Sequence, residues 1–388
     1  MAELTPRARR VLWGLGALYA LVNVFIGVHS GGDFVYELRL TERLLHGLPL
    51  YATVDPSALR GLPWPPFATL ALIPFALIAR VSLPVAKALW AVGNVALFGW
   101  CLVRAFGYTR RWRPVVLAVA AIAQPLQSNF QHLNVNLVLL GLVCLAIREL
   151  EAEREVRAAL WIGVAAALKG YPAAMFLYFL ARGRWRPLAA GTVTALGLTL
   201  VAGLPYGLAG WGVMRDYVQL ALAAPSTQAL GGQAIGGLVT RLGGGLPTAI
   251  ALDLLCAGAV AAVLWYHRTA GEPVTDLGMS AVLAVLLAPL DRLHYYVLAF
   301  PAWTATFAQG APTRDPTIGA LARGGWWVTL ALGALLTSGM LSQITGRLPD
   351  GLQVIRQNTY ILGALLLLAV LVIQRARTPA PGHVVQPR

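Results

Sequence analysis

The 388-residue chain is 58% hydrophobic and 12% charged, with a mean hydropathy of +0.67. This composition excludes a water-soluble globule with one buried core and predicts a multi-pass protein of the lipid bilayer. The net charge of +14 does not indicate a nucleic-acid partner. The basic residues form short runs between apolar segments, as cytoplasmic loops of membrane proteins do.

The first apolar run, 11–28, follows a basic start and lacks a small-residue cleavage site, so we expect a retained first helix. The other predicted apolar segments are 64–80, 84–106, 114–125, 134–147, 158–181, 187–205, 248–266, 277–290, 295–309, 325–343 and 358–374. Several are shorter than the roughly 20 residues of a straight span. The predicted fold is therefore all-α and polytopic, with about 11–13 transmembrane or half-spanning helices.

One membrane-embedded domain is predicted over 1–388, because no internal repeat or soluble segment is visible. A first outer loop, 29–63, contains an amphipathic helix that could lie along the membrane interface. A second, long outer loop covers 206–247, and a disordered tail covers 378–388.

The basic loops predict the orientation, provided that two apolar segments do not cross the membrane as single helices. Segment 64–80 opens with Trp64-Pro65-Pro66-Phe67 and is predicted to be an outer half-helix. Segment 158–181 is predicted to break at Lys169-Gly170-Tyr171-Pro172, because proline disfavours helix at the preceding residue. Most of the basic residues and both termini then lie in the cytoplasm. The remaining polar segments face outward, where irregular backbone indicates one water-filled cavity.

Asp33 follows Gly31-Gly32 and opens the amphipathic segment 34–45. Aspartate is a common N-cap, and a carboxylate here could also remove a proton from an attacking hydroxyl. The two roles are compatible.

The segment from Gln127 to Asn136 holds five amides and His132 between two apolar segments. Amides donate and accept, which suits sugar hydroxyls, but they also suit a structural network that links short helices.

Lys169 lies in an apolar stretch with no nearby acid, and a buried cation normally faces an anion or water. We expect a lipid phosphate there; the alternative is a side chain that reaches the interface along apolar surface. Arg292 and His294 could add a charge and a titratable imidazole, or could belong to an interfacial belt with Tyr295 and Tyr296.

Other polar features carry no chemistry. Cys101, Cys144 and Cys256 lie in apolar segments without metal-ligand spacing, and no metal site or cofactor is predicted. The glycine-rich stretch 231–237 is predicted to be flexible loop, and Asp216 and Arg241 to be solvated charges. Asp253 receives no role.

Several short motifs, in order and spacing, resemble those of the GT-C superfamily, and most closely glycosyltransferase family 87, over about residues 11–374. These motifs are Asp33-Phe34-Val35-Tyr36, Gly47-Leu48-Pro49-Leu50-Tyr51, Trp64-Pro65-Pro66-Phe67, Asn136-Leu137, Leu168-Lys169-Gly170-Tyr171-Pro172 and Pro289 through His294.

The resemblance implies a GT-C-like bundle that takes a sugar from a polyprenyl monophosphate on the outer side of the plasma membrane. It implies a catalytic carboxylate at Asp33, a catalytic histidine at His294 and a lysine before a broken helix at Lys169. The predicted substrate-binding residues are Lys169, Arg292, Asn134, Asn136, Gln131, Tyr36 and Tyr171. Leu133-Asn134 replaces a more usual Gly-Gln.

The resulting hypothesis is an inverting transfer of a hexose, most simply mannose, from a polyprenyl-phosphate donor to a glycolipid or glycan acceptor, with Asp33 as general base. The alternatives are a lipid or sugar transporter and an inactive scaffold of the same fold. Broken helices are common in transporters, although no inverted repeat is visible.

Overall fold

The computed structural model describes residues 6–51, 64–228, 232–269, 271–288, 292–309, 320–343 and 349–377. All regular elements in these ranges are helices, which confirms the all-α prediction. The predicted tail, 378–388, lies outside the described residues, as do Pro289 to Asp291.

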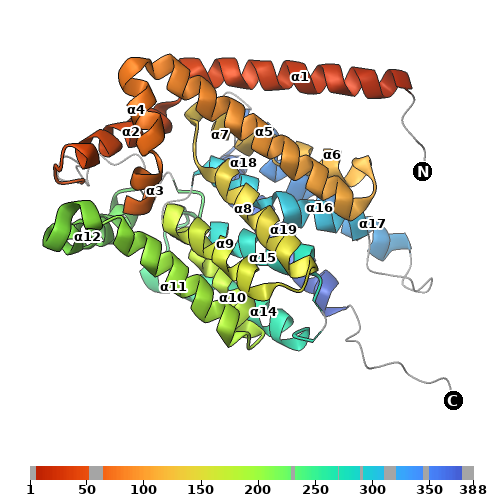
Figure 1. The fold of residues 1–388 in the computed structure, drawn as a ribbon. Helices are drawn as coiled ribbons and strands as arrows, with labels where there is room; N and C mark the ends of the chain where they lie inside the picture. Colours follow the sequence, from red (N-terminus) through yellow and green to blue (C-terminus); the bar gives the residue numbers. More distant parts are fainter. Residues whose placement is uncertain are drawn as a thin grey trace.

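The first half of the chain forms a series of helices, most of them joined by short breaks (Figure 1). They are α1 (Pro6–His29), α2 (Gly32–Leu45), α3 (Pro66–Ala71), α4 (Ile73–Val81), α5 (Leu83–Thr109), α6 (Trp112–Ala121), α7 (Ala123–His132), α8 (Asn136–Glu151), α9 (Glu155–Leu168), the 3-10 helix η2 (Tyr171–Phe176), α10 (Leu177–Ala181) and α11 (Trp185–Val201).

The second half continues the bundle. Its helices are η3 (Leu204–Ala209), α12 (Gly210–Gln228), α13 (Ile235–Arg241), α14 (Leu246–Tyr266), α15 (Pro273–Leu286), η4 (Leu293–Ala299), α16 (Phe300–Gln309), α17 (Ala320–Thr337), η5 (Met340–Gln343), α18 (Asp350–Gln357) and α19 (Thr359–Ala376).

Few of these helices could cross a bilayer alone. Among the described residues, α5, α14 and α19 are long and apolar enough, and α1 and α2 qualify together as a pair bent by 49°. Several others are short apolar helices, in agreement with the predicted half-spanning elements. Large apolar side chains such as Leu254 and Leu255 of α14 face outward, as expected against lipid.

The predicted break of segment 158–181 is present, and segment 64–80, predicted to be a single half-helix, is also divided. Segment 64–80 divides into α3 and α4 at Leu72, just before Ile73-Pro74. α9 ends where Lys169 adopts an extended conformation, with φ −160° and ψ 109°, three residues before Pro172. Because the chain then continues as the 3-10 helix η2, Lys169 lies at the end of a helix and not along its side.

The polar segment Gln127 to Asn136 and the predicted loop 206–247 are both mostly helical. Gln127 to Gln131 lie within α7, and the polar segment becomes irregular only over 133–135. The predicted outer loop 206–247 contains parts or all of η3, α12 and α13, so its description as one long loop was wrong. Leu220 of α12 shares a small apolar cluster with Leu40 and Leu44 of α2, and this burial stabilises helix over loop.

The glycine-rich stretch also needs correction, because Gly236 and Gly237 belong to α13. Arg241, predicted to be solvated, is half-buried and donates hydrogen bonds to the Asn358 side chain (2.8 Å) and to the Gly232 carbonyl (2.6 Å). It therefore joins α13 to the start of α19.

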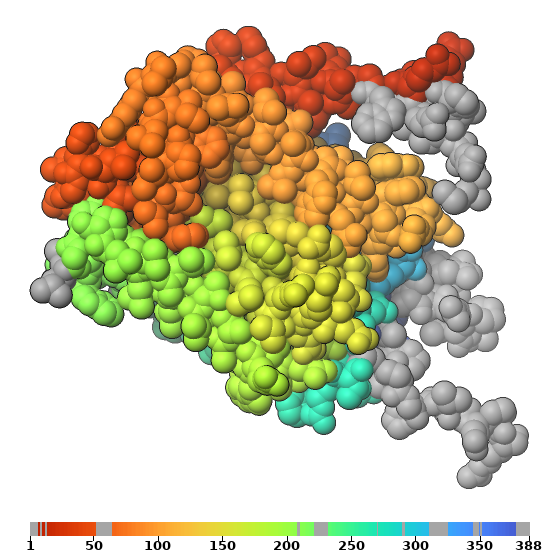
Figure 2. Space-filling view, viewed as in Figure 1, coloured from red at the N-terminus to blue at the C-terminus, as the bar shows by residue number. Residues whose placement is uncertain are grey.

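α15 lies at the centre of the bundle and is buried over nearly its whole length. α9 and α11 pack very closely, because a Cβ atom on Gly163 would lie 2.5 Å from the Gly191 carbonyl oxygen. Small residues allow this backbone approach. At one end of the molecule the orange-red segments α2 to α4 meet the green α12 (Figure 2).

The bundle has two chemically different ends. α9 begins at Glu155, which pairs with Arg184, and finishes beside Lys169, about 20 Å away for 14 helical residues. α15 likewise begins with Asp276 in its first turn and leads toward His294. We call the Lys169 and His294 end the site end and the other the arginine end.

Candidate functional site

Asp33 lies in the first turn of α2, where the chain turns sharply after α1. Gly31 takes the left-handed conformation, with φ 60°, and its N–H donates to the Gln131 carbonyl at 2.9 Å. Gly31, not Asp33, occupies the N-cap position, and no side chain caps the helix. The N-cap interpretation of Asp33 was therefore wrong, and its carboxylate is available to the interior of the site.

The Asp33 carboxylate meets two of the predicted residues. Asn134 Nδ2 donates a hydrogen bond to Asp33 Oδ2 at 2.7 Å. His294 Nε2 lies 3.8 Å from the same oxygen. Asp33 is 37% exposed whereas His294 is 5% exposed, so the carboxylate lies at the accessible edge of a buried polar cluster.

Lys169 occupies the buried side of this cluster, with 6% of its surface exposed. Its Nζ donates to Asn134 Oδ1 at 3.0 Å and to Asn136 Oδ1 at 3.3 Å, and lies 3.8 Å from the centroid of the Tyr295 ring. A cation over an aromatic face is stabilised by the ring quadrupole. Lys169 is thus held within the protein, and does not reach out to an interface along apolar surface.

Asn136 and the neighbouring rings complete the cluster. Asn136 Oδ1 also accepts from the Tyr171 hydroxyl at 3.1 Å, and its Nδ2 donates to the His294 carbonyl at 3.3 Å. The Tyr171 and Tyr295 rings stack with centroids 4.8 Å apart. Asn136 therefore links the broken α9–η2 segment to η4, as the structural-network interpretation of the amides expects. Sugar contact by these amides stays a prediction.

Within the described residues, the side chains of three predicted residues make no hydrogen bond or ion pair with this cluster. Gln131 is exposed and contributes its backbone carbonyl to Gly31. Tyr36 is 38% exposed on α2, and Arg292 is exposed at the start of η4. The structure thus unites Asp33, Asn134, Asn136, Lys169, Tyr171 and His294.

Two charged residues near the site were missed by sequence reasoning. Glu37, one turn after Asp33, is 2% exposed, and its Oε1 accepts from the Trp64 backbone N–H at 2.8 Å. Lys87 Nζ donates to the carbonyls of Ser30 (2.9 Å) and Val28 (3.2 Å). Two signals in the sequence could have identified them. Glu37 follows Asp33 by four residues, which places both acids on one face of a helix, and Lys87 is one of only two lysines in the chain.

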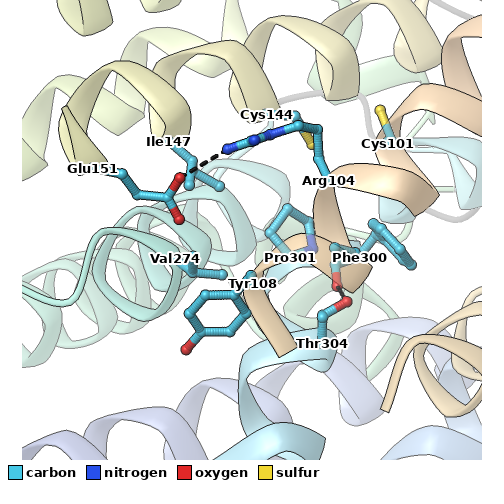
Figure 3. A pocket seen from close by; sticks show the side chains of 11 residues that line it. Cys101, Arg104, Tyr108, Cys144, Ile147, Glu151, Val274, Phe300, Pro301 and Thr304 are labelled. Atoms are coloured by element: carbon cyan, nitrogen blue, oxygen red, sulfur yellow. Dashed lines mark hydrogen bonds and ion pairs between the residues drawn. The ribbon is translucent and has the colours of Figure 1, made fainter. Parts of the chain in front are cut away.

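Within the described ranges, no group of three or more His, Cys, Asp or Glu residues could hold a metal ion. A pocket between α5, α8 and α16 lies elsewhere and includes none of the predicted site residues (Figure 3). It is lined by Cys101, Cys144, Tyr108 and the exposed pair Arg104–Glu151, whose atoms lie 2.8 Å apart. Cys101 and Cys144 are buried, as predicted for small core residues.

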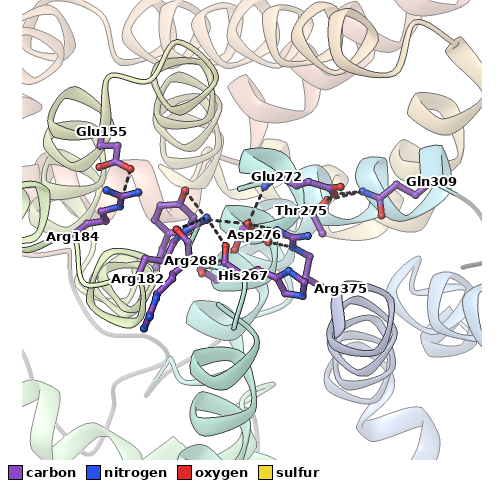
Figure 4. Close-up of polar contacts among 12 residues, drawn as sticks. Glu155, Arg182, Arg184, His267, Arg268, Glu272, Thr275, Asp276, Gln309 and Arg375 are labelled. Atoms are coloured by element: carbon purple, nitrogen blue, oxygen red, sulfur yellow. Dashed lines mark hydrogen bonds and ion pairs between the residues drawn. The ribbon is translucent and has the colours of Figure 1, made fainter. Parts of the chain in front are cut away.

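The arginine end contains a second buried polar cluster (Figure 4). Asp276 Oδ2 accepts from Arg182 Nη1 at 3.0 Å, and Asp276 Oδ1 accepts from Arg375 Nε at 2.8 Å. Arg182 also donates to the His267 carbonyl at 2.9 Å. We call Arg182, Asp276 and Arg375 the buried triad; it joins α10, α15 and α19.

These features define a helical membrane protein with a buried acid, amide and lysine site at one end of its bundle. The sequence profile of glycosyltransferase family 87 matches residues 63–293, and the chain belongs to this family. It is therefore a membrane glycosyltransferase, in agreement with the resemblance that the sequence motifs show.

Curated relatives extend the similarity over most of the chain. A polyprenol-phosphate-mannose-dependent alpha-(1-2)-phosphatidylinositol mannoside mannosyltransferase of Mycolicibacterium smegmatis is 27% identical, over 83% of this chain and 82% of its own length. The protein of the same name from Mycobacterium tuberculosis is 29% identical, over 76% of each chain. A phosphatidylinositol pentamannoside mannosyltransferase of M. smegmatis is 26% identical, over 65% of this chain and 62% of its own length. No solved structure gives a significant match.

Proposed function

We propose that this glycosyltransferase transfers mannose from a polyprenyl-phosphate donor to an acceptor of the phosphatidylinositol-mannoside type, on the outer side of the plasma membrane. The names of the curated relatives support the donor and the acceptor class. The main geometric support is the contact of Asp33 with Asn134 and His294, because it combines an accessible carboxylate with buried positioning groups. The transporter alternative has no comparable support among the relatives.

In the proposed step, Asp33 accepts the proton of an acceptor hydroxyl, and that oxygen forms a bond to the anomeric carbon of the donor sugar. The bond from this carbon to the phosphate oxygen breaks, and its electron pair leaves on the phosphate. Attack opposite the leaving group inverts the anomeric configuration. Lys169 supplies positive charge that stabilises the developing negative charge, with Arg292 at the accessible edge.

The proposal also includes one membrane-embedded domain with both termini in the cytoplasm. The acidic and basic groups at the arginine end support this orientation. Arg148 and Arg154 pair with Glu149, and Arg184 pairs with Glu155, at the end opposite Asp33. Such a concentration of arginine is typical of the cytoplasmic side.

Replacing Asp33 with asparagine tests the general base. Detergent-solubilised protein is supplied with radiolabelled polyprenyl-phosphate-mannose and a phosphatidylinositol mannoside, and the labelled glycolipid is measured. A general base contributes about 10²–10⁴-fold, so Asp33→Asn should reduce kcat by at least about 100-fold. The matched control is Asp216→Asn, which removes an exposed acid paired with its neighbour Arg215 and should leave turnover unchanged.

The assay also separates an enzyme from a transporter, because detergent removes sealed compartments and only an enzyme then consumes the donor. If the wild-type protein is active and the Asp33→Asn variant has nearly the same kcat, Asp33 is excluded as the general base. Absence of any labelled product with wild-type protein would refute the proposed substrates.

A further inference from the structure

Asn134 lies between the negative and the positive group of the site. Its Nδ2 donates to Asp33 Oδ2 at 2.7 Å, and its Oδ1 accepts from Lys169 Nζ at 3.0 Å. A carboxylate only accepts hydrogen bonds and an ammonium only donates them. The amide orientation is therefore determined by its two partners, with nitrogen toward Asp33 and oxygen toward Lys169.

The backbone holds Asn134 in this position. Leu133 adopts the left-handed conformation, with φ 51°, and its carbonyl accepts from the Trp90 indole N–H at 2.8 Å. The Asn134 N–H donates to the Asn129 carbonyl at 3.1 Å, and the residue is 2% exposed. A buried amide fixed at this turn has little freedom to turn toward a substrate.

We propose that Asn134 is a positioning residue that keeps the Lys169 ammonium apart from the Asp33 carboxylate while binding both. This inference rests on the proposed function, in which Asp33 is the base. A direct contact with a cation would stabilise the charged carboxylate and weaken it as a proton acceptor. The neutral amide positions the carboxylate without placing a full positive charge against it.

Charged or titratable groups occur on α2 itself and on the elements around the site. They are Glu37 and Glu42 on α2, Arg80 on α4, Lys87 on α5, His132 on α7, Lys169 after α9, and Arg292 and His294 at η4. Arg80 pairs with Glu42, whereas the His132 and His294 rings lie 5.5 Å apart. None of these residues is itself replaced when residue 134 alone is changed, so a difference between the variants begins with the loss or alteration of this amide.

Three substitutions of Asn134 test the inference through the pH profile of kcat/KM for labelled donor. Asn134→Gln retains the amide and should keep the wild-type profile, with kcat within about threefold. Asn134→Asp removes the donor to Asp33 and adds a like charge, so the acid limb should move about 1–3 units toward higher pH. Asn134→Leu removes both hydrogen bonds and should lower kcat by at least about 100-fold, with the KM of the donor little changed.

The matched control is Asn94→Leu. Asn94 is an equally buried asparagine on α5, and neither of its amide atoms has a hydrogen-bond partner within the described part of the chain. This change should leave the pH profile and kcat unaltered. It separates the loss of a buried amide in general from the loss of this one.

The outcomes distinguish the two proposals. An Asn134→Asp profile with the wild-type acid limb and an equal loss at every pH would show a merely structural role and overturn the inference. If Asn134→Asp does not fold, Asn134→Leu decides, and retention of more than about a third of wild-type kcat overturns the inference. In both of these cases the wild-type protein would still be active, so the proposed function would be retained. An inactive wild-type protein would instead overturn the proposed function and this inference together.

Discussion

Asp276→Asn should strongly destabilise the protein, because Asp276 is the acid of the buried triad. The side chains of Asp276, Arg182 and Arg375 are 0%, 4% and 2% exposed. Asparagine keeps the shape of aspartate but has one acceptor oxygen where aspartate has two, so one arginine loses its acceptor. Removing one partner of a buried ion pair costs about 3–5 kcal/mol, because a buried charge is left uncompensated.

Thermal unfolding in detergent measures this effect, with a fluorogenic maleimide that reacts with thiols as they become exposed. Cys101 and Cys144 are buried in the folded protein and are suitable reporters. A loss of about 3–5 kcal/mol should lower the unfolding midpoint by roughly 5–10 °C.

The control is Glu151→Gln, which removes an ion pair with Arg104 of similar length. Both side chains are about one-third exposed, at 34% and 35%, and exposed pairs contribute under about 1 kcal/mol. If Asp276→Asn lowered the midpoint no more than Glu151→Gln does, the argument from burial would be refuted.

Two further changes probe other parts of the fold. Burial and the charge of Arg375 lower the pKa of His267 below its ordinary 6.5, so folding disfavours the bound proton. Stability should therefore be complete above about pH 6.5 and decline as pH falls below it. In the thiol assay, His267→Asn should lessen this decline between about pH 6.5 and 5.5. Equal declines in the two proteins would count against this role. Gly163→Ala should lower the free energy of unfolding by about 1–3 kcal/mol, because the added Cβ would lie 2.5 Å from the Gly191 carbonyl oxygen. The control is Gly197→Ala on α11, where an added Cβ would have no atom within 4 Å, and this change should be neutral or slightly stabilising. An unchanged midpoint for Gly163→Ala would show that α9 and α11 can separate without cost.

The short motifs of the resemblance selected residues that lie together in the structure, whereas polarity alone did not always do so. Asp33, Lys169 and His294 were each identified from a short motif, and the structure brings them together through Asn134 and Asn136. Gln131 was selected because it lies in a polar run, but that run is helical. In a helix neighbouring side chains point in different directions, so Gln131 faces outward while Asn129 is buried.

The break of segment 158–181 was also predictable, because proline acts locally. Pro172 lacks the N–H that would continue the hydrogen bonds of α9, and the chain leaves the helix at Lys169, three residues earlier; the division between α3 and α4 at Leu72 likewise precedes Pro74. The helices in the predicted loop 206–247 could not be predicted from the sequence, because α12 and α13 are stabilised by burial against α2 and other distant segments. Such tertiary stabilisation leaves only a weak local signal.

The sequence by itself determined that this is a helical membrane protein, that segment 158–181 breaks near Pro172, and which acid and lysine lie in the motifs of the resemblance. Hydropathy and proline act over a few residues, so these features are visible in the chain. Only the tertiary structure decided that Asp33 is not a helix cap, that Asn134 separates it from Lys169, and that two arginines enclose Asp276. Those contacts join residues far apart in the chain, and their geometry depends on how the helices pack.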